Sequence, residues 1–477
     1  MTQYPDVKLY IGGQWIETTD HLDVLNPADE RVIGRTPLAG RTELDAAVSA
    51  AAEGFKVWSR MSPRNRGQIM LKAAALMRER VDEIACSITL EQGKPVSEAR
   101  LEVIRGCEFF EWDAAEGQRT YGRVIPSEAG IRYVVTRQPV GMVAAFSPWN
   151  FPLSQPSRKI AGALAAGCSI IIKPAEETPA GAYHIARALH DAGVPPGVFN
   201  LVFGTPSEIS GYLIPHDQTR LVAFTGSTRV GKHLTELAAR HMKPVLMELG
   251  GHAPVIVCDD VDPRAAAIAS AIRKARNAGQ VCTSPTRFFV QERIFDEFVE
   301  AFGEKARSIK IGNGFESGVE LGPLANHRRV EALVALVADA RAKGARVLVG
   351  GEQVGSCGYF FPLTLLVDVP DDARVMQEEP FGPLAVVNRV GSLEEAIEKA
   401  NSVPFGLAAY AFTHSAANVA LIADRIEAGN ISINTLEASV AETPFGGVKD
   451  SGYGREGGAE GLDHYTAVKT LSHYTLT

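Results

Sequence analysis

The sequence predicts an α/β protein of two or three domains, built on parallel β-sheets that helices cover on both faces. The chain of 477 residues is longer than one hydrophobic core usually supports. After about residue 140, short β-rich runs alternate with helical segments, which is typical of a covered parallel sheet. The alternation starts again near residue 254 and continues to residue 435, which indicates a second α/β domain.

The region before the first sheet, residues 43–115, is expected to be helical. Its long segments "ELDAAVSAAAEGFKVW" and "RGQIMLKAAALMRERVDEIACSITLEQGK" carry apolar residues at three- and four-residue spacing and are rich in Ala, Leu, Met and Glu. The first series of strands is expected in four runs: "VGMVAAFS" (140–147), "CSIIIK" (168–173), "FNLVFG" (199–204) and "LVAFTG" (221–226).

One helix of this series has clear end signals. In "TPAGAYHIARALHDAG", Thr178 is expected to be the N-cap, Pro179 the first helical residue and Gly193 the stop. Residues 123–141 are expected to form a hairpin. The β-rich segment 464–477 that closes the chain is expected to pair with this hairpin or with another subunit.

Composition excludes several classes of protein. Hydrophobic residues make up 45% of the chain and charged residues 22%, which are ordinary globular values. The net charge of −8 argues against binding to nucleic acid or to an anionic membrane. The start "MTQYPDVKLY" lacks the features of a signal peptide, and no apolar run approaches the roughly 20 residues of a spanning helix. We therefore expect a soluble cytoplasmic protein.

The cysteines are sparse and scattered. There is no CxxC pair and no pair of histidines four residues apart, so neither a disulfide framework nor a zinc site has support. We expect no metal. The six cysteines are Cys86, Cys107, Cys168, Cys258, Cys282 and Cys357.

Cys282 stands in "NAGQVCTSPTR", after a helix that ends at Asn277, Ala278 and Gly279. From these residues alone it is either a small packed side chain or a nucleophile. A free thiol titrates near about 8.5, so a nucleophilic cysteine needs local help. No histidine partner is evident, which disfavours a papain-type cysteine hydrolase.

Polar residues follow the expected strands, where ligands bind in open α/β sheets. Asn150 in "SPWNFP" lies in a turn locked by two prolines, so its amide either donates to an oxyanion or caps the turn. In "FTGSTRVGKHL", Gly226, Ser227 and Gly231 either cradle a phosphate at a helix start or form a simple tight turn. The GxGxxG fingerprint is absent.

Two further strand ends carry carboxylates. Lys173 and Glu176 in "IIIKPAEETP" either contact ribose hydroxyls or form a solvated charge pair, and the carboxylate would repel a 2′-phosphate, which favours NAD over NADP. Glu248 in "MELGGHAP" follows an apolar run. It is either a general base with a raised pKa or a surface residue beside a glycine turn.

Seven motifs occur in one order: "PWNFP", "KPAEETP", "FTGSTRVG", "MELGG", "GQVCTSPTR", "EEPFGP" (378–383) and "PFGGVKDSGYGREGG" (444–458). In these landmarks, and in "LYIGGQWIE" and "LNPADE" near the N-terminus, the chain resembles the aldehyde dehydrogenase superfamily over nearly its whole length. The resemblance implies a Rossmann-like NAD-binding domain (1–120 and 140–249) and an α/β catalytic domain (250–445). It also implies a small β oligomerisation element (121–139 and 459–477) that forms homodimers or homotetramers.

The resemblance assigns chemistry to three residues. Cys282 would attack the aldehyde carbon to form a thiohemiacetal, and Asn150 with the Cys282 N–H would hold the oxyanion. Loss of hydride to the nicotinamide would leave a thioester on Cys282. Glu248 would activate the water that hydrolyses it. Members that transfer the acyl group to coenzyme A generally lack this base, so its presence favours hydrolysis.

The resemblance also implies cofactor contacts. Lys173 and Glu176 match contacts to the adenosine ribose, Trp149 and Ser227 lie in the pyrophosphate neighbourhood, and Glu379 matches the contact to the nicotinamide ribose. NAD is the expected cofactor and NADP remains open. The complete expected set is Ser147, Trp149, Lys173, Glu176, Gly226, Ser227, Gly231, Leu249, Glu379 and Phe381.

For the substrate, members that act on semialdehydes with a distal carboxylate resemble this chain at Arg158, which offers a bidentate clamp, and at Ser439. Phe445 is also expected at the substrate. The best match is a short carboxylated semialdehyde, with 2-oxoglutarate semialdehyde and succinate semialdehyde nearly equal. Hydroxyaldehydes and aromatic aldehydes stay open. A non-catalytic protein on this scaffold is the remaining alternative, disfavoured because Cys282, Asn150 and Glu248 are all present.

Overall fold

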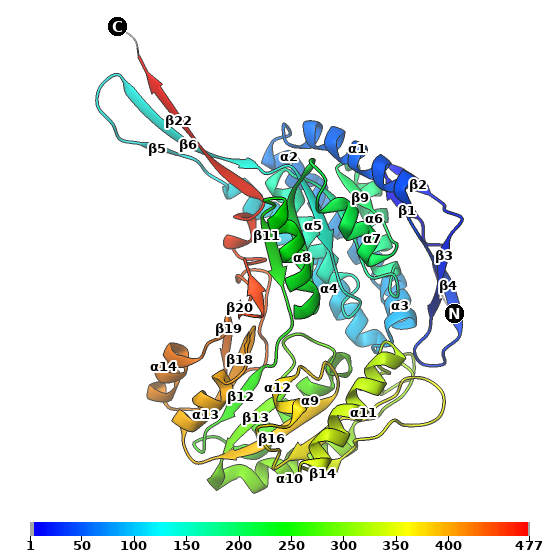
Figure 1. Cartoon of the computed structure of the whole chain (residues 1–477), viewed down its shortest axis with the longest axis vertical. Coiled ribbons are helices and arrows are strands. Elements are labelled where there is room, and N and C mark those ends of the chain that lie inside the picture. The colour runs from blue at the N-terminus through cyan, green and yellow to red at the C-terminus, as the bar shows by residue number, and fades with distance from the viewer. Residues whose placement is uncertain (1–3, 476–477) are drawn as a thin grey trace.

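Two large β-sheets organise residues 4–475, the part of the chain that the computed structural model describes (Figure 1). The predicted first domain and the predicted C-terminal oligomerisation segment extend beyond these residues, to 1–3 and 476–477. The first sheet has eight strands. Its five central strands are parallel and lie in the order β9 (Phe199–Leu201), β8 (Ser169–Lys173), β7 (Met142–Phe146), β10 (Thr219–Thr225) and β11 (Val245–Glu248).

The edges of this sheet differ from the predicted all-parallel arrangement. β1 (Leu9–Ile11) joins β9 in antiparallel fashion and carries β2 (Gln14–Ile16), and β21 (Gly452–Tyr453) adds antiparallel to β11. These edge strands come from opposite ends of the chain, so no local pattern of alternating strand and helix announces them. The interior strands β7 and β8 are wholly buried, as their continuous apolar runs predict.

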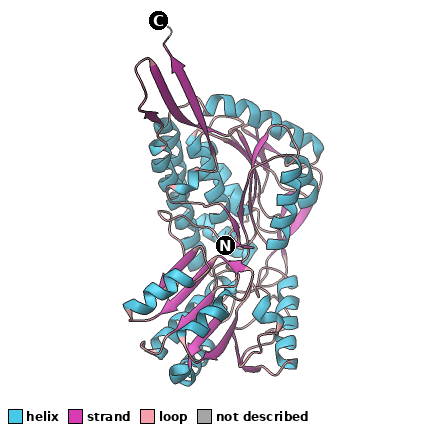
Figure 2. Ribbon diagram, turned by 60° about the vertical axis from the view of Figure 1, so that its left-hand side comes forward, coloured by secondary structure: helices cyan, strands magenta, loops and turns pink. Residues whose placement is uncertain are grey.

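Helices cover the first sheet in two layers, and the strands run between them (Figure 2). α1 (Arg41–Trp58), α5 (Ser154–Ala166), α6 (Ala180–Ala192) and α8 (Thr228–Arg240) contact the strands, and α7 (Pro206–Leu213) contacts α1. The predicted helical region also supplies an outer layer that packs on α5 and α6. This layer comprises α2 (Pro63–Glu79), α3 (Val81–Gln92) and α4 (Val96–Glu116), which is followed by the short 3-10 helix η1 (Gly117–Arg119).

The second sheet has seven strands and its own hydrophobic core, as predicted from the second strand–helix series. The strand order is β14 (Arg346–Val349), β15 (Thr364–Val367), β16 (Leu384–Val390), β13 (Arg287–Gln291), β12 (Pro254–Val257), β18 (Ala408–Phe412) and β19 (Asn430–Ile433), and only β14 is antiparallel. The helices of this half are α9 (Pro263–Ala275), α10 (Glu292–Ser308), α11 (His327–Ala342), α12 (Arg374–Gln377), α13 (Leu393–Asn401) and α14 (Ala416–Arg425).

A three-stranded arm projects from the body beside the C-terminus (Figure 1). The predicted hairpin is β5 (Arg123–Ile125) with β6 (Ile131–Pro139), and β22 (Thr466–Tyr474) pairs along the whole of β6. Of the two predicted pairings, the structure therefore has the one within the chain. Apolar side chains stay exposed on the arm at Val124, Val468 and Leu471.

Smaller elements complete the described chain. Within residues 4–475, none of the helices combines the length and the apolar composition needed to cross a membrane. The remaining elements are the hairpin of β3 (His21–Leu25) and β4 (Val32–Pro37), the pair β17 (Phe405–Gly406) and β20 (Val448–Lys449), and the 3-10 helices η2 (Arg276–Gly279) and η3 (Glu460–Leu462).

The predicted start of α6 is wrong in its capping residue. The helix begins at Ala180, and the hydroxyl of Thr178 is buried without a hydrogen-bond partner. Instead, the buried carboxylate of Glu91 on α3 accepts from the backbone N–H groups of Ala180 (2.8 Å) and Gly181 (3.2 Å). A cap from a distant helix replaces the local one. Gly193 ends the helix with a φ of 90°, as predicted.

Candidate active site

The parallel register of the first sheet brings the carboxyl ends of its strands to one edge. Phe146 on β7 lies opposite Lys173 on β8, and Thr225 on β10 lies opposite Glu248 on β11. The chain leaves this edge through residues 249–253 and enters the second sheet at β12. The segments that follow the four strands therefore meet between the two sheets.

The turn that carries Asn150 is fixed by a buried ion pair from the helical layer. Lys94 and Glu102 pair with each other, and both side chains are shielded from solvent. Nζ of Lys94 donates to the carbonyl of Asn150 at 2.9 Å, while Glu102 Oε1 accepts from the N–H groups of Leu153 (2.9 Å) and Ser154 (3.2 Å). Each charge thus has further hydrogen bonds, as a buried pair requires.

The loop before Cys282 has an unusual backbone. After α9 ends at Ala275, Asn277, Ala278 and Gly279 have φ angles of 49°, 50° and 67°. Such angles cost about 1–3 kcal/mol in a residue other than glycine, so the surrounding contacts must enforce them. Gly279 has no alternative, because a Cβ there would lie 2.1 Å from the carbonyl oxygen of Gly382.

Hydrogen bonds to Asn277 hold this loop against the Asn150 turn. The backbone N–H of Asn277 donates to Glu98 Oε2 on α4 at 2.8 Å. Its side-chain amide donates to the carbonyl of Asn150 at 2.8 Å and to that of Gln280 at 3.2 Å. The two loops predicted to carry the nucleophile and the oxyanion donor are therefore tied together.

The side chain of Asn150 contacts the loop at Gln280, two residues before Cys282. Its Nδ2 donates to the carbonyl of Gln280 at 3.0 Å, and its Oδ1 is buried without a hydrogen-bond partner. The structure brings the amide to the Cys282 loop, with one of its two N–H bonds already used. The second N–H of the amide is the one left for an oxyanion.

Cys282 lies where two cavities meet. The larger cavity, of about 510 Å³, opens along the ends of the first-sheet strands, and the smaller, of about 80 Å³, lies on the side of α5 and Ser439. Cys282 and Gln155 line both. The other lining residues of the smaller cavity are Arg105, Phe109, Phe151, Ser154, Arg158, Arg273, Arg276, Val281, Thr283, Glu437, Ser439 and Phe445.

The thiol of Cys282 is held in its protonated form. Burial, with the charges of Glu379 and Glu248, raises its pKa to about 12. The Glu379 carboxylate is nearby because its Oε1 accepts from the N–H of Gly251 at 3.1 Å. A thiol with this pKa carries its proton at neutral pH, so a base must remove the proton before the sulfur can attack a carbonyl.

Glu248 is such a base by its environment, although it lines neither cavity. Both carboxyl oxygens are buried without a hydrogen-bond partner, and burial followed by repulsion from Glu456 raises its pKa well above the ordinary value. Its Oε1 fills the space above Gly446, where a Cβ would lie 2.8 Å away. Glu248 therefore has the environment expected of a proton acceptor, and its carboxyl group lies against Gly446 and lines neither cavity.

The segment 444–458 builds the surroundings of Glu248. Through β21 it pairs with β11, and the N–H of Leu249 donates to the carbonyl of Ser451 at 3.0 Å. Ser451 Oγ donates to the carbonyl of Gly250 at 2.7 Å. From the sequence alone, this motif was only a family landmark. In the structure it packs against β11, the strand that ends at Glu248.

A buried ion pair holds Glu456, the carboxylate whose charge, together with burial, raises the pKa of Glu248. Nζ of Lys159 on α5 donates to Glu456 Oε1 at 2.7 Å, and neither side chain is more than 2% exposed. The pair was not predicted, because its residues are 297 positions apart and neither stands in a pattern that indicates chemistry.

Six of the ten expected cofactor residues line the larger cavity, together with Asn150 and Cys282. The ring of Trp149 packs edge-on against that of Phe381, with centroids 5.5 Å apart. Phe381 has a φ of 43°, which is strained for a bulky residue and is maintained beside this cavity. The six are Trp149, Gly226, Ser227, Leu249, Glu379 and Phe381.

The other four lie elsewhere. Lys173 and Glu176 form an ion pair past the end of β8, outside the lining of the cavity. Ser147 Oγ is buried without a partner. Gly231 faces Leu249, where a Cβ would meet Cδ2 at 2.2 Å, so this glycine allows α8 to pack closely.

The larger cavity fits a dinucleotide. Four polar atoms of its lining residues are buried without a hydrogen-bond partner, which suits a polar ligand: Asn150 Oδ1, Thr225 Oγ1, Asn326 Oδ1 and Arg329 Nε. Three arginines, Arg229, Arg328 and Arg329, supply positive charge for a pyrophosphate. The N-terminus of α8 also lies at the wall of this cavity, where its backbone N–H groups suit an anion. Arg328, Arg329 and Asn326 were missed, because no motif marked the start of α11, and Arg229 was not singled out although it lies in the motif "FTGSTRVG".

In the smaller cavity, Arg158 has no carboxylate within 4 Å among the described residues. Its guanidinium lies 3.9 Å from the ring centroid of Phe109 and 5.2 Å from that of Phe445. It donates to Ser439 Oγ at 2.5 Å and to the carbonyl of Glu456 at 3.4 Å. The predicted set Arg158, Ser439 and Phe445 is therefore brought together on one wall.

Arg276 is a second cation that sequence reasoning missed. It lies six residues before Cys282 and lines the same cavity. Within residues 4–475 its guanidinium has neither a carboxylate within 4 Å nor a hydrogen-bond partner, and it lies 5.9 Å from the ring centroid of Phe151. Arg158 and Arg276 thus leave positive charge unmatched beside the thiol, which favours an anionic ligand.

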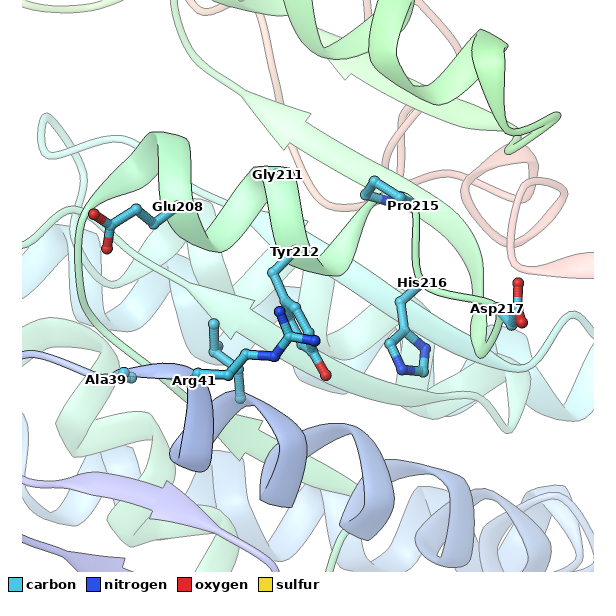
Figure 3. Close-up of a pocket in the computed structure, with 10 residues that line it drawn as sticks. Ala39, Arg41, Glu208, Gly211, Tyr212, Pro215, His216 and Asp217 are labelled. Atoms are coloured by element: carbon cyan, nitrogen blue, oxygen red, sulfur yellow. The ribbon is translucent and has the colours of Figure 1, made fainter.

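A separate hollow of about 660 Å³ between α1 and α7 lacks such chemistry (Figure 3). Arg41 lies across the ring of Tyr212, 4.2 Å from its centroid, and the Tyr212 hydroxyl donates to Asp45 at 2.5 Å. Arg41 also pairs with Asp45 at 3.3 Å. The cation of this hollow is already partnered, and no cysteine lines it.

Comparison with known proteins agrees with this geometry. The profile of the aldehyde dehydrogenase family matches residues 15–471. The chain is 45% identical to 4-(hydroxymethyl)benzenesulfonate dehydrogenase of Comamonas testosteroni, over 98% of each chain, and 41% identical to the NADP(+) succinate-semialdehyde dehydrogenase of Escherichia coli strain K12, over 97% and 96%. The crystal structure of succinate-semialdehyde dehydrogenase from Burkholderia pseudomallei superposes with a TM-score of 0.96 at 40% identity, over 98% of each chain.

Proposed function

The chain belongs to the aldehyde dehydrogenase family and is an NAD(P)-dependent aldehyde dehydrogenase, and we propose that it oxidises a short aldehyde bearing a carboxylate to the corresponding acid. Succinate semialdehyde and 2-oxoglutarate semialdehyde are the preferred candidates. The single observation that carries this proposal is the pair of unmatched guanidinium groups, Arg158 and Arg276, in the cavity that ends at Cys282.

Catalysis begins with activation of the thiol. Since burial keeps the Cys282 proton in place, the ionised form of Glu248 accepts it, directly or through water, and its raised pKa makes it a stronger base than an ordinary carboxylate. The thiolate then forms a C–S bond with the aldehyde carbon, and the carbonyl oxygen becomes an oxyanion. The free N–H of Asn150 and the backbone N–H of Cys282 donate to that oxygen.

NAD(P)+ bound in the larger cavity supplies the acceptor for the hydride that leaves the tetrahedral carbon. The oxyanion re-forms its C=O bond as the C–H bond breaks, which leaves a thioester on Cys282. Glu248 then releases the thiol proton to solvent and, as a carboxylate again, takes a proton from water, and the resulting hydroxide adds to the thioester carbonyl. The C–S bond breaks, the carboxylic acid is released, and the departing thiolate takes the proton from Glu248, which restores both groups.

The cofactor residues favour NAD over NADP. Glu176 is held at the end of β8 by Lys173, and a carboxylate there accepts from ribose hydroxyls and repels a 2′-phosphate. A relative is named for NADP(+), so both dinucleotides belong in the assay. Trp149, Ser227, Glu379 and the three arginines of the cavity would hold the remainder of the cofactor.

The size of the smaller cavity ranks the substrates. Its volume of about 80 Å³ is roughly half of the 150 Å³ that accommodates a benzene molecule in an engineered protein core. A chain of four or five carbons therefore fits better than an aromatic ring. The carboxylate would bind Arg158 and Arg276 while the aldehyde carbon lies at Cys282.

An anionic aromatic aldehyde is the second candidate. Three phenylalanines, Phe109, Phe151 and Phe445, line the small cavity, and a 45% identical relative is named for an aromatic sulfonate. A sulfonate and a carboxylate place the same charge on an arginine.

The proposal extends to the arrangement of the chain. Residues 1–120 and 140–249 would form the cofactor domain, 250–445 the catalytic domain, and 121–139 with 459–477 the contacts of a homodimer or homotetramer. The exposed apolar side chains of the arm support its proposed place in the contacts between subunits.

Formation of NADH or NADPH, followed at 340 nm with matched aldehydes, tests the proposal. We expect kcat/KM for succinate semialdehyde to exceed that for butanal by about a hundredfold, since one charge-assisted interaction with arginine accounts for a factor of this order. Equal values for the two aldehydes would refute a carboxylate-binding site. A higher value for 4-formylbenzenesulfonate would select the second candidate.

A further inference from the structure

The four arginines around the small cavity fall into two pairs. Arg158 and Arg276 have no carboxylate within 4 Å in the described chain, whereas Arg105 and Arg273 both bind Glu437. Arg105 Nη2 lies 3.0 Å from Oε1 of Glu437, and Arg273 Nη1 lies 3.0 Å from Oε2. One carboxylate therefore bridges two cations from different helices, α4 and α9.

The bridge stands at the open side of the cavity. The side chains of Arg273, Arg105 and Glu437 are 15%, 29% and 41% exposed, while Arg158 is only 8% exposed as a residue. A substrate whose aldehyde lies at Cys282 and whose carboxylate binds Arg158 would direct any further substituent toward Glu437. The bridge is thus the outer limit of the substrate site.

The segment that carries Glu437 also shapes the inner site. The Glu437 N–H donates to Thr435 Oγ1 at 3.3 Å, and its carbonyl accepts from Ser432 Oγ at 2.9 Å. Two residues later, the carbonyl of Ser439 accepts from Arg105 Nη1 at 3.2 Å, and Ser439 Oγ accepts from Arg158. The carboxylate is therefore held in place rather than free to swing away from an incoming anion.

We propose that Glu437 is a specificity residue that restricts the enzyme to aldehydes with a single anionic group. It occupies Arg273 and Nη2 of Arg105, whose Nε lies 3.8 Å from Glu108, so these donors are not open to a second carboxylate. It also presents negative charge to any substrate that carries one. The inference rests on the proposed function, because it takes the inner pair as the site of the first anionic group.

The test compares Glu437→Gln with wild type and with a matched control, Glu442→Gln. Glu442 is exposed on the same loop, so its substitution makes the same change in net charge. The substrates are butanal, succinate semialdehyde and 2-(2-oxoethyl)butanedioate, which is succinate semialdehyde with a carboxymethyl group beside its carboxylate. The quantity compared is the ratio of kcat/KM for the dianion to kcat/KM for the monoanion.

We expect Glu437→Gln to raise this ratio by roughly tenfold, because like charges no longer oppose each other at the mouth. The gain should shrink in 0.5 M salt, since the groups are partly exposed and screened. Addition of Arg105→Gln to Glu437→Gln should return the ratio toward wild type. The Glu442→Gln control should stay within twofold of wild type.

An unchanged ratio in Glu437→Gln would overturn the inference, as would an equal loss of kcat/KM for all three aldehydes, which would mean that the bridge only supports the loop. Failure of the proposed function has a different signature. In that case wild type shows no preference for succinate semialdehyde over butanal, while the dianion-to-monoanion ratio still distinguishes Glu437→Gln from Glu442→Gln.

Discussion

The side-chain amide of Asn277 donates to the main-chain carbonyl of Asn150 at 2.8 Å, and this bond joins the loop before Cys282 to the turn that carries Asn150. The bond crosses from the second sheet to the first. Asn277 holds a φ of 49° to make it, and this left-handed angle is one that asparagine tolerates better than most residues. Together with the bond from Asn150 Nδ2 to the carbonyl of Gln280, it sets the relative position of Cys282 and Asn150.

Asn277→Gly should separate catalysis from stability. Glycine adopts the positive φ without strain, so the melting temperature should change little, while loss of the amide should lower kcat by about tenfold or more. Steady-state kinetics and thermal unfolding measure the two effects. A variant that keeps full kcat would show that the bond does not position the site.

Loss of the inner cations should act on anionic substrates alone. Arg276→Ala and Arg158→Ala should each raise KM for succinate semialdehyde by roughly 10- to 100-fold, since each removes charge-assisted hydrogen bonds, and leave KM for butanal nearly unchanged. Arg100→Ala, on the exposed side of α4 where Arg100 pairs with Asp82, is the control. An equal rise for both aldehydes would indicate a general structural defect.

Asp113 on α4 should make the preference for anions depend on pH. Burial raises its pKa to about 8, and the charge of Arg158 opposes that rise. Below this pH the side chain is neutral. Above it, a carboxylate forms near Arg158 and competes with the substrate anion.

The ratio of kcat/KM for succinate semialdehyde to that for butanal should therefore fall as pH rises from 7 to 9.5. Because the ratio compares two substrates of the same enzyme, the titration of groups that affect both reactions equally cancels. Asp113→Asn should abolish the fall. A ratio that rises with pH in wild type would contradict the assignment.

Glu176 should control the choice of dinucleotide. Glu176→Gln removes the charge that opposes a 2′-phosphate, so kcat/KM with NADP should rise by about tenfold relative to NAD. Glu208→Gln is a suitable control, because Glu208 is exposed on α7 and lines neither cavity beside Cys282. A wild type that already prefers NADP would overturn the interpretation of Glu176.

Sequence reasoning located the groups that follow strands, since the carboxyl ends of parallel strands must meet at one edge. Asn150 and Glu248 were predicted in this way and through their motifs, and Cys282, which follows a helix, through its motif alone. It missed the Lys159–Glu456 pair, the Glu437 bridge and the Glu91 cap, because each joins residues that are far apart in the chain. It also misplaced the N-cap of α6, where the local signal at Thr178 competes with a better acceptor from α3.

Mass spectrometry of a trapped acyl enzyme tests the central claim that the substrate is bound covalently through Cys282 and released by Glu248. Glu248→Gln, incubated with NAD and succinate semialdehyde, should accumulate one succinyl group per chain on the peptide that contains Cys282, with one NADH formed per chain. Both should form more slowly than a wild-type turnover, because hydroxide from solvent must replace Glu248 as the acceptor of the thiol proton. Cys282→Ser should show neither. A Glu248→Gln enzyme that turns over at the wild-type rate without an adduct, or an active Cys282→Ser enzyme, would contradict it.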